Sequence, residues 1–164
     1  MTRTARNPEE AITSHIIRRL SIMSNKKILV VEDDADVRLG YHVLLQAHHY
    51  DTFFAADSLS AISEARKHKP DLIILDLGLP AGDGFIVLER LGVIPHLAVI
   101  PVIVVSARDL QGNKERALKA GARAFVQKPW NDDELLAIIS QLLGQPDISV
   151  AQPEGSAIRA ADDM

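Results

Sequence analysis

The sequence predicts an α/β fold, an open and doubly wound sheet of five parallel strands with five helices on its two faces. Short apolar runs alternate with longer amphipathic segments from residue 27 to about residue 144, which is the pattern of repeated βα units. Three of the runs consist only of β-branched residues or leucine, as expected of parallel strands that are covered on both faces. Right-handed crossovers between such units produce the doubly wound arrangement.

Five apolar runs are the candidate strands. They cover residues 28–31, 52–55, 72–75, 102–105 and 124–126. The first, third and fourth consist only of β-branched residues or leucine, so we expect them to be buried on both faces of the sheet.

The segments between the strands have helical periodicity. The apolar face of the first segment comprises Val37, Tyr41, Leu44 and Leu45. Leu59 and Ile62 share one face of the second segment. The last helix has the clearest signals, because Asn131 can cap it, a broad apolar stripe follows, and Gly144 can end it.

The chain is expected to form one domain with a segment at each end. Its 164 residues suit a single core, which we assign to residues 25–145. Residues 1–24 include a helix-like piece over 9–22 that belongs to no βα unit, and we expect an N-terminal extension that is partly helical or disordered. Residues 146–164 are small, polar and acidic without periodicity, which is typical of a flexible tail.

Composition excludes several kinds of function. A net charge of -4 gives no general attraction to nucleic-acid phosphates, so no direct nucleic-acid ligand is expected. The absence of cysteine excludes disulfides, thiol nucleophiles and thiolate metal sites. No apolar run approaches the length that crosses a bilayer, so we expect no membrane insertion and a cytoplasmic location.

Polar residues follow the candidate strands at one edge of the predicted sheet. Glu32 and Asp33 come directly after the first strand, Asp76 after the third, Ser106 after the fourth, and Lys128 just past the fifth. Ligands of such sheets bind beyond the carboxyl ends of the strands. Carboxylates gathered there repel one another by about 4 kcal/mol per pair at 4 Å and an effective dielectric near 20, so a cation is expected among them. Oxygen donors favour Mg²⁺ first and Mn²⁺ next.

Each of these residues also has a simpler structural explanation. A single aspartate after a strand commonly lies in a turn or caps the next helix, and Ser106 can do the same. Lys128 before Pro129 can be a surface residue, and Pro129 also permits a cis peptide bond. Two acidic clusters and a lysine at the ends of neighbouring strands together favour a functional site.

Four motifs follow one another along the chain: ILVVEDD, PDLIILDLGLPAGDG, IPVIVVSA and GARAFVQKP. With these motifs, residues 27–144 resemble the CheY-like receiver domain of two-component response regulators. The resemblance implies a flavodoxin-like fold with strand order 2-1-3-4-5. It also implies a phosphoprotein that acts in signalling and catalyses only its own phosphorylation and dephosphorylation.

The resemblance assigns the acidic residues to phosphorylation and to metal binding. Asp76 matches the phosphoacceptor that becomes an aspartyl phosphate. Glu32 and Asp33 match the acidic pair that holds Mg²⁺ together with Asp76 and the backbone carbonyl of Gly78. Phosphoryl transfer depends mostly on positioning and countercharge, which a metal ion and a lysine would supply.

Three further residues match family positions. Lys128 matches the lysine that pairs with the phosphoryl group, and Ser106 matches the hydroxyl residue that turns toward it. Phe125 matches the aromatic residue that changes rotamer together with this hydroxyl. The switch would act on the surface formed by the helix after residues 102–105, the strand at 124–126 and the helix that begins at Asn131.

The resemblance implies a sensor histidine kinase or a histidine phosphotransfer protein as the phosphodonor. Nothing after Gly144 is long enough for an output domain, so we expect a stand-alone receiver that controls a downstream effector protein or serves as a phosphorelay intermediate. A binding module that works without phosphorylation is disfavoured, because every chemical position is occupied by a competent residue. A Mg²⁺-dependent phosphohydrolase would need a second acid where this chain has Gly78.

Overall fold

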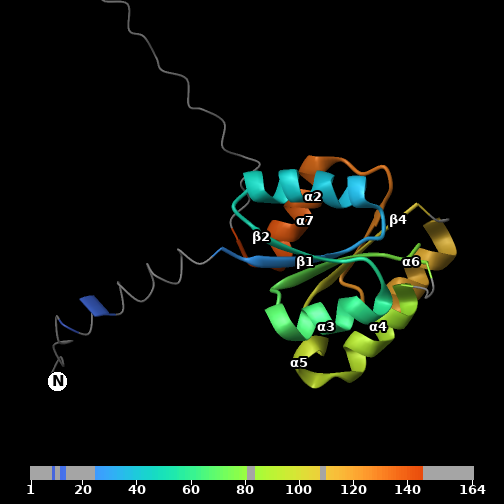
Figure 1. Ribbon diagram of the computed structural model, residues 1–164, viewed down its shortest axis with the longest axis horizontal. Coiled ribbons are helices and arrows are strands. Elements are labelled where there is room, and N and C mark those ends of the chain that lie inside the picture. Colours follow the sequence, from blue (N-terminus) through green and yellow to red (C-terminus); the bar gives the residue numbers. More distant parts are fainter. Residues whose placement is uncertain (1–8, 10–11, 14–24, 81–83, 108–109, 146–164) are drawn as a thin grey trace, which may run out of the picture.

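The computed structural model describes residues 9, 12–13, 25–80, 84–107 and 110–145, and its centre is a sheet of five parallel strands (Figure 1). The strands are β1 (Lys27–Val31), β2 (Asp51–Ala55), β3 (Leu72–Asp76), β4 (Val102–Ser106) and β5 (Ala124–Gln127). They lie in the order β2-β1-β3-β4-β5, and each neighbouring pair is parallel. The predicted α/β class and strand order are confirmed.

Helices cover both faces of the sheet, as Figure 1 shows. One face carries α2 (Ala35–Ala47) and α7 (Asp132–Leu142), and the other carries α3 (Ser58–His68), α4 (Gly84–Val93) and α6 (Leu110–Lys119). Between α4 and β4, the described residues form a helix that the sequence did not predict. This helix, α5 (Pro95–Ala98), is a single turn with Pro95 at its first position, where proline is favourable.

The core lies on both sides of the sheet, and every residue of β3 and β4 is buried. On α2, the predicted apolar face packs inward through Tyr41 and Leu45. On α3, Leu59 and Ile62 border the same pocket, as their predicted common face requires, but Leu59 is 72% exposed. The buried side of α3 is formed by Ala61 and Ala65, and Leu59 precedes Ala61 by two positions, which places it on the opposite side of the helix.

Asn131 caps α7, as the sequence predicted. Its side-chain oxygen accepts hydrogen bonds from the backbone N–H groups of Asp133 (2.9 Å) and Glu134 (3.3 Å). Replacing Asn131 by alanine leaves these two donors without the cap and is expected to lower the free energy of unfolding by about 1 kcal/mol. Urea denaturation tests this, with Asn131→Ser as a control that keeps a capping oxygen. An Asn131→Ala variant as stable as the native chain would contradict it.

The predicted end segments fall largely outside the described residues. Of the predicted N-terminal extension, only Glu9, Ile12 and Thr13 are described, and they are helical. The rest of residues 1–24 and the predicted tail over 146–164 lie outside the described part of the chain, so the domain boundaries stay predictions. Among the described helices, none is both long enough and apolar enough to cross a membrane.

Candidate functional site

The structure brings the three acidic residues together at the edge where β1 and β3 end. Glu32 and Asp33 follow β1, and Asp76 is the last residue of β3. Each offers a carboxylate oxygen, and these oxygens all lie within 4.8 Å of one another. Glu32 is buried, Asp76 is 9% exposed, and Asp33 is exposed, so the cluster opens to solvent on one side.

The loop after β1 is held by α2. The guanidinium Nη1 of Arg38 donates hydrogen bonds of 2.8 Å to the carbonyl oxygens of both Glu32 and Asp33. The backbone N–H of Asp34 donates to Oε1 of Glu32 at 3.1 Å. Asp34 itself caps α2 through hydrogen bonds from two backbone N–H groups of its first turn, so it is a structural member of the acidic run. Arg38 was missed from the sequence, because no motif marks a basic residue one turn into a helix.

Lys128 connects the ends of three strands. Its Nζ donates to Oε2 of Glu32 at 2.7 Å and to Oδ2 of Asp76 at 3.0 Å. Its backbone N–H donates to the carbonyl oxygen of Ser106 at 3.0 Å, and its peptide bond to Pro129 is cis. The ammonium group therefore supplies positive charge directly between two of the three carboxylates.

Both oxygens of Asp76 accept hydrogen bonds. Oδ2 accepts from Lys128, and Oδ1 accepts from the backbone N–H of Gly78 at 2.8 Å. A Cβ atom at Gly78 would lie 3.3 Å from Oδ1 of Asp76, which is a tight contact. Glycine at this position therefore avoids crowding the Asp76 carboxylate.

Burial and charge shift the titration of three groups around the cluster. Burial raises the pKa of the Glu32 carboxyl, although the hydrogen bond from Lys128 partly opposes this effect. Burial alone would lower the pKa of Lys128, but the hydrogen bonds to Glu32 and Asp76 outweigh it and raise this pKa, so the ammonium stays charged at neutral pH. Burial, and then the negative charges of Glu32 and Asp76, raise the pKa of Tyr41, so its hydroxyl stays neutral.

Ser106 and Phe125 lie on neighbouring strands and share one face of the sheet. Ser106 ends β4 and is fully buried, while Phe125 on β5 pairs with Val104 and is partly buried. Val104 belongs to the core under α3, α4 and α6, and residues two positions apart on a strand point to the same face. The side chains of Ser106 and Phe125 therefore both point toward the layer that contains α6.

Loss of the Lys128 ammonium should destabilise the metal-free protein. In Lys128→Met, the buried Glu32 carboxylate and Asp76 would face each other without the cation, and we expect the free energy of unfolding to fall by about 1–3 kcal/mol. Urea denaturation in a chelator measures this, with the exposed Lys119→Met as the control. Adding Mg²⁺ should restore part of the loss. Equal stability of both variants would show that Lys128 does not balance the acidic cluster.

Comparison with known proteins shows the family of the chain. The chain matches the response regulator receiver domain family over residues 28–140. It is 34% identical over 119 residues to the polar-differentiation response regulator DivK of Brucella anthropi, covering 73% of this chain and 97% of that protein. It is also 40% identical over 110 residues to the transcriptional regulatory protein KdpE of Escherichia coli, covering 67% of this chain but 48% of that protein.

Solved structures show the same fold. The receiver domain of a sensor histidine kinase from Pseudomonas aeruginosa, which has a magnesium ion coordinated in its active-site cleft, is 28% identical with a TM-score of 0.69 and aligns over 74% of this chain and all of that one. The chemotaxis protein CheY4 of Vibrio cholerae is 25% identical with a TM-score of 0.69 over 73% of this chain and 99% of that one. From its fold, its motifs and these matches, the chain belongs to the response regulator receiver domain family of two-component signalling.

Proposed function

We propose that this protein is a response regulator that accepts a phosphoryl group on Asp76 and then controls a partner protein. The donor would be a sensor histidine kinase or a histidine phosphotransfer protein, and the reaction would take place in the cytoplasm. The observation that carries this proposal is the position of the Asp76 carboxylate, which touches the Lys128 ammonium at 3.0 Å and lies beside two further carboxylates.

The donor set fits a small hard cation. We assign Mg²⁺, with Mn²⁺ as a substitute, to the carboxylates of Glu32, Asp33 and Asp76 and to the backbone carbonyl of Gly78. All of these donors are oxygen atoms, and the exposure of Asp33 leaves room for the water ligands that Mg²⁺ usually keeps. When bound, the ion would neutralise charge on the transferred phosphoryl group.

Asp76 and Lys128 would have different roles in the phosphoryl transfer. A carboxylate oxygen of Asp76 would attack the phosphorus atom, the bond from phosphorus to the donor's imidazole nitrogen would break, and the electron pair of that bond would stay with the nitrogen. The product is an acyl phosphate, a labile covalent state. Lys128 already lies beside the attacking group, so its ammonium can pair with a phosphoryl oxygen without a large movement.

Ser106 and Phe125 would transmit the effect of phosphorylation from the site to the protein surface. A phosphoryl group on Asp76 would attract the Ser106 hydroxyl, and Phe125 would repack on the shared face of the sheet. This change would bias the surface formed by α6, β5 and α7 between two arrangements. The effector that reads this surface is then a protein that distinguishes the two arrangements.

Metal-dependent phosphorylation tests the proposal. The full chain is incubated with Mg²⁺ and acetyl phosphate, or with a phosphorylated histidine phosphotransfer protein, and its intact mass is measured with and without a chelator. We expect the gain of one phosphoryl group, which disappears in the chelator. A chain that gains no phosphoryl group from either kind of donor would contradict the proposal and would indicate a binding module that works without phosphorylation.

A further inference from the structure

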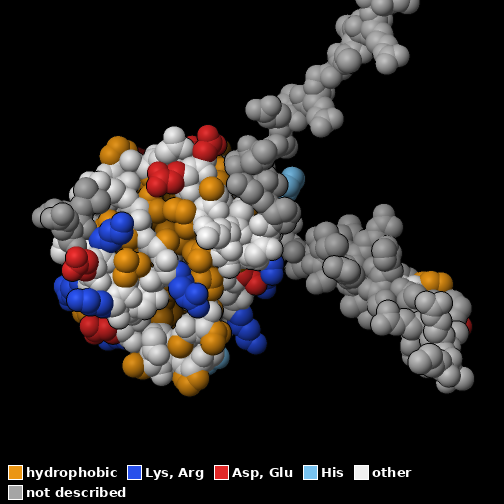
Figure 2. All heavy atoms as spheres, turned by 180° about the vertical axis from the view of Figure 1, so that it is seen from behind, with side chains coloured by type: hydrophobic (Ala, Val, Ile, Leu, Met, Phe, Trp, Pro, Cys, Tyr) orange, Lys and Arg blue, Asp and Glu red, His pale blue; other side chains and the backbone are white. Residues whose placement is uncertain are grey.

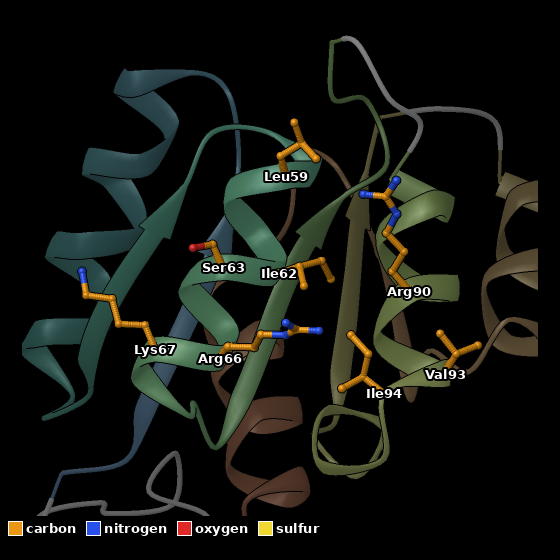
Figure 3. Close-up of a pocket in the computed structure, with 8 residues that line it drawn as sticks. All are labelled: Leu59, Ile62, Ser63, Arg66, Lys67, Arg90, Val93 and Ile94. Carbon is orange, nitrogen blue, oxygen red and sulfur yellow. The ribbon is translucent and has the colours of Figure 1, made fainter.

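A groove runs between α3 and α4, and it shares no residue with the acidic site. Its volume is about 660 Å³. Apolar side chains from both helices form its walls, and Figure 3 shows Ile62 pointing from α3 toward α4, with Val93 and Ile94 at the end of α4. Ile62 and Ile94 also pack against the core, so the walls of the groove are fixed by the fold.

Two of the apolar residues are unusually open to water. Leu59 at the start of α3 is 72% exposed, and Val93 at the end of α4 is 78% exposed. Large apolar residues that line one hollow, rather than lying scattered, are typical of an interaction site. The groove therefore offers apolar surface that the described part of the chain leaves uncovered.

The described charged residues that line the groove are all basic. Arg66 on α3 and Arg90 on α4 both line it, and neither forms an ion pair with any described residue. No acidic residue is among the described residues that line the groove. Figure 3 shows Arg66 extending toward α4, whereas Lys67, which also borders the groove, points away from α4 and lies 4.0 Å from Glu64. Within the described part of the chain, the two guanidinium groups therefore place positive charge beside apolar walls without an acidic partner.

Exposed apolar residues alone do not distinguish this groove. Figure 2 shows the molecule from behind, where hydrophobic side chains also reach the surface and both acidic and basic side chains lie around them. The distinguishing feature of the groove is the combination of a hollow, apolar walls and two arginines that pair with no described acidic residue. This combination specifies the chemistry of an occupant.

We infer that the groove between α3 and α4 binds an acidic amphipathic helix of a partner protein. A hollow between two helices accepts the ridge of a third, whose apolar residues at positions i, i+3 or i+4, and i+7 would contact Leu59, Ile62 and Val93. Carboxylates on the flanks of that ridge would pair with Arg66 and Arg90, because guanidinium groups bind carboxylates with two parallel hydrogen bonds. From Leu59 to Arg66 the α3 wall measures about 10 Å, which matches two turns of such a helix.

An anionic membrane fits these features less well. The chain has a net charge of -4, and a wide anionic lipid surface would meet a whole face of the molecule, whereas a single acidic helix would meet only the groove. The apolar residues also line a hollow, whereas a flat bilayer contacts protruding side chains. The binding of a partner helix needs no phosphoryl group on Asp76, so its test is independent of the function proposed above.

The test is a selection of peptide ligands. A display library of 16-residue helical peptides, random in charge, is selected against the full unphosphorylated chain, and the recovered peptides are measured by fluorescence anisotropy. We expect acidic peptides with apolar residues spaced three and four apart. Reversal of both charges in Arg66→Glu/Arg90→Glu should weaken their binding by about tenfold or more. Lys114→Glu/Lys119→Glu on α6, which makes the same change in net charge, should leave the affinity within about twofold.

Each other outcome would overturn the inference. A selection that gives no ligand, or ligands that are not acidic, would do so, and so would equal losses in the two charge-reversal variants. Binding that appears only after residues 146–164 are removed would identify the chain's own acidic tail as the occupant. Binding of the full chain to vesicles with 30% phosphatidylserine that is lost in Arg66→Glu/Arg90→Glu would identify a lipid surface.

Discussion

Replacement of Asp76 by asparagine is expected to abolish phosphorylation and to leave the fold intact. The asparagine side chain has the same shape, and its amide oxygen can still accept the hydrogen bond from the Gly78 N–H. It lacks the charged oxygen that must attack phosphorus, so the label on the chain should fall from one phosphoryl group to none. Intact mass after incubation with acetyl phosphate and Mg²⁺ measures the change.

The control for this variant is Asp36→Asn. Asp36 is an exposed residue in the first turn of α2, close to the acidic site in the chain but outside the cluster of three carboxylates. Asp36→Asn makes the same chemical change and should keep full phosphorylation. Full labelling of Asp76→Asn, with the control equally labelled, would place the acceptor at another residue.

Gly84→Ala is expected to destabilise the protein strongly, unlike Gly92→Ala in the same helix. An added Cβ at Gly84 would lie 2.5 Å from the backbone oxygen of Asp76 and 2.7 Å from the Cα of Leu77. These are backbone atoms that cannot rotate away, so α4 or the end of β3 must shift. We expect the free energy of unfolding to fall by about 3 kcal/mol and phosphorylation to slow, because the shift displaces Asp76, the proposed phosphoacceptor.

Gly92→Ala in the same helix is a matched control. A Cβ at Gly92 meets no atom within 4 Å, and alanine has a higher helix propensity than glycine by about 1 kcal/mol. Urea denaturation should therefore show Gly92→Ala slightly stabilised and Gly84→Ala strongly destabilised. A Gly84→Ala variant with native stability and a native phosphorylation rate would show that the close approach of α4 to Asp76 is not required.

The strands were predictable from sequence because their burial makes them uniformly apolar. Each predicted strand lies within one residue of the observed bounds, and the missing residues were polar ones such as Asp76 and Ser106, which end strands while facing the site. The sheet order required the family resemblance, since the apolar runs themselves do not specify which strands pair. The single turn of α5 is too short to show a period, so it was not predicted.

The sequence predicts which side chains meet at the site, but not which residues hold them in place. Residues that follow strands must meet at one edge of a parallel sheet, so Glu32, Asp76 and Lys128 could be grouped from sequence alone. The hydrogen bonds from Arg38 and the backbone contact at Gly84 depend on how α2 and α4 pack, which local pattern does not determine. Leu59 shows the same limit, because two small alanines rather than the larger leucine form the buried side of α3.

The most direct test of the central claim is to locate the phosphoryl group chemically. The full chain is phosphorylated with Mg²⁺ and acetyl phosphate and is then treated immediately with borohydride, which reduces any acyl phosphate. The chain is then digested, and its peptides are mapped by mass spectrometry. Reduction converts an aspartyl phosphate into homoserine, and we predict homoserine at position 76 in the native chain and none when Mg²⁺ is chelated. Homoserine at the position of another aspartate would contradict the assignment of Asp76. A phosphoryl group on another residue that borohydride does not remove would contradict it as well.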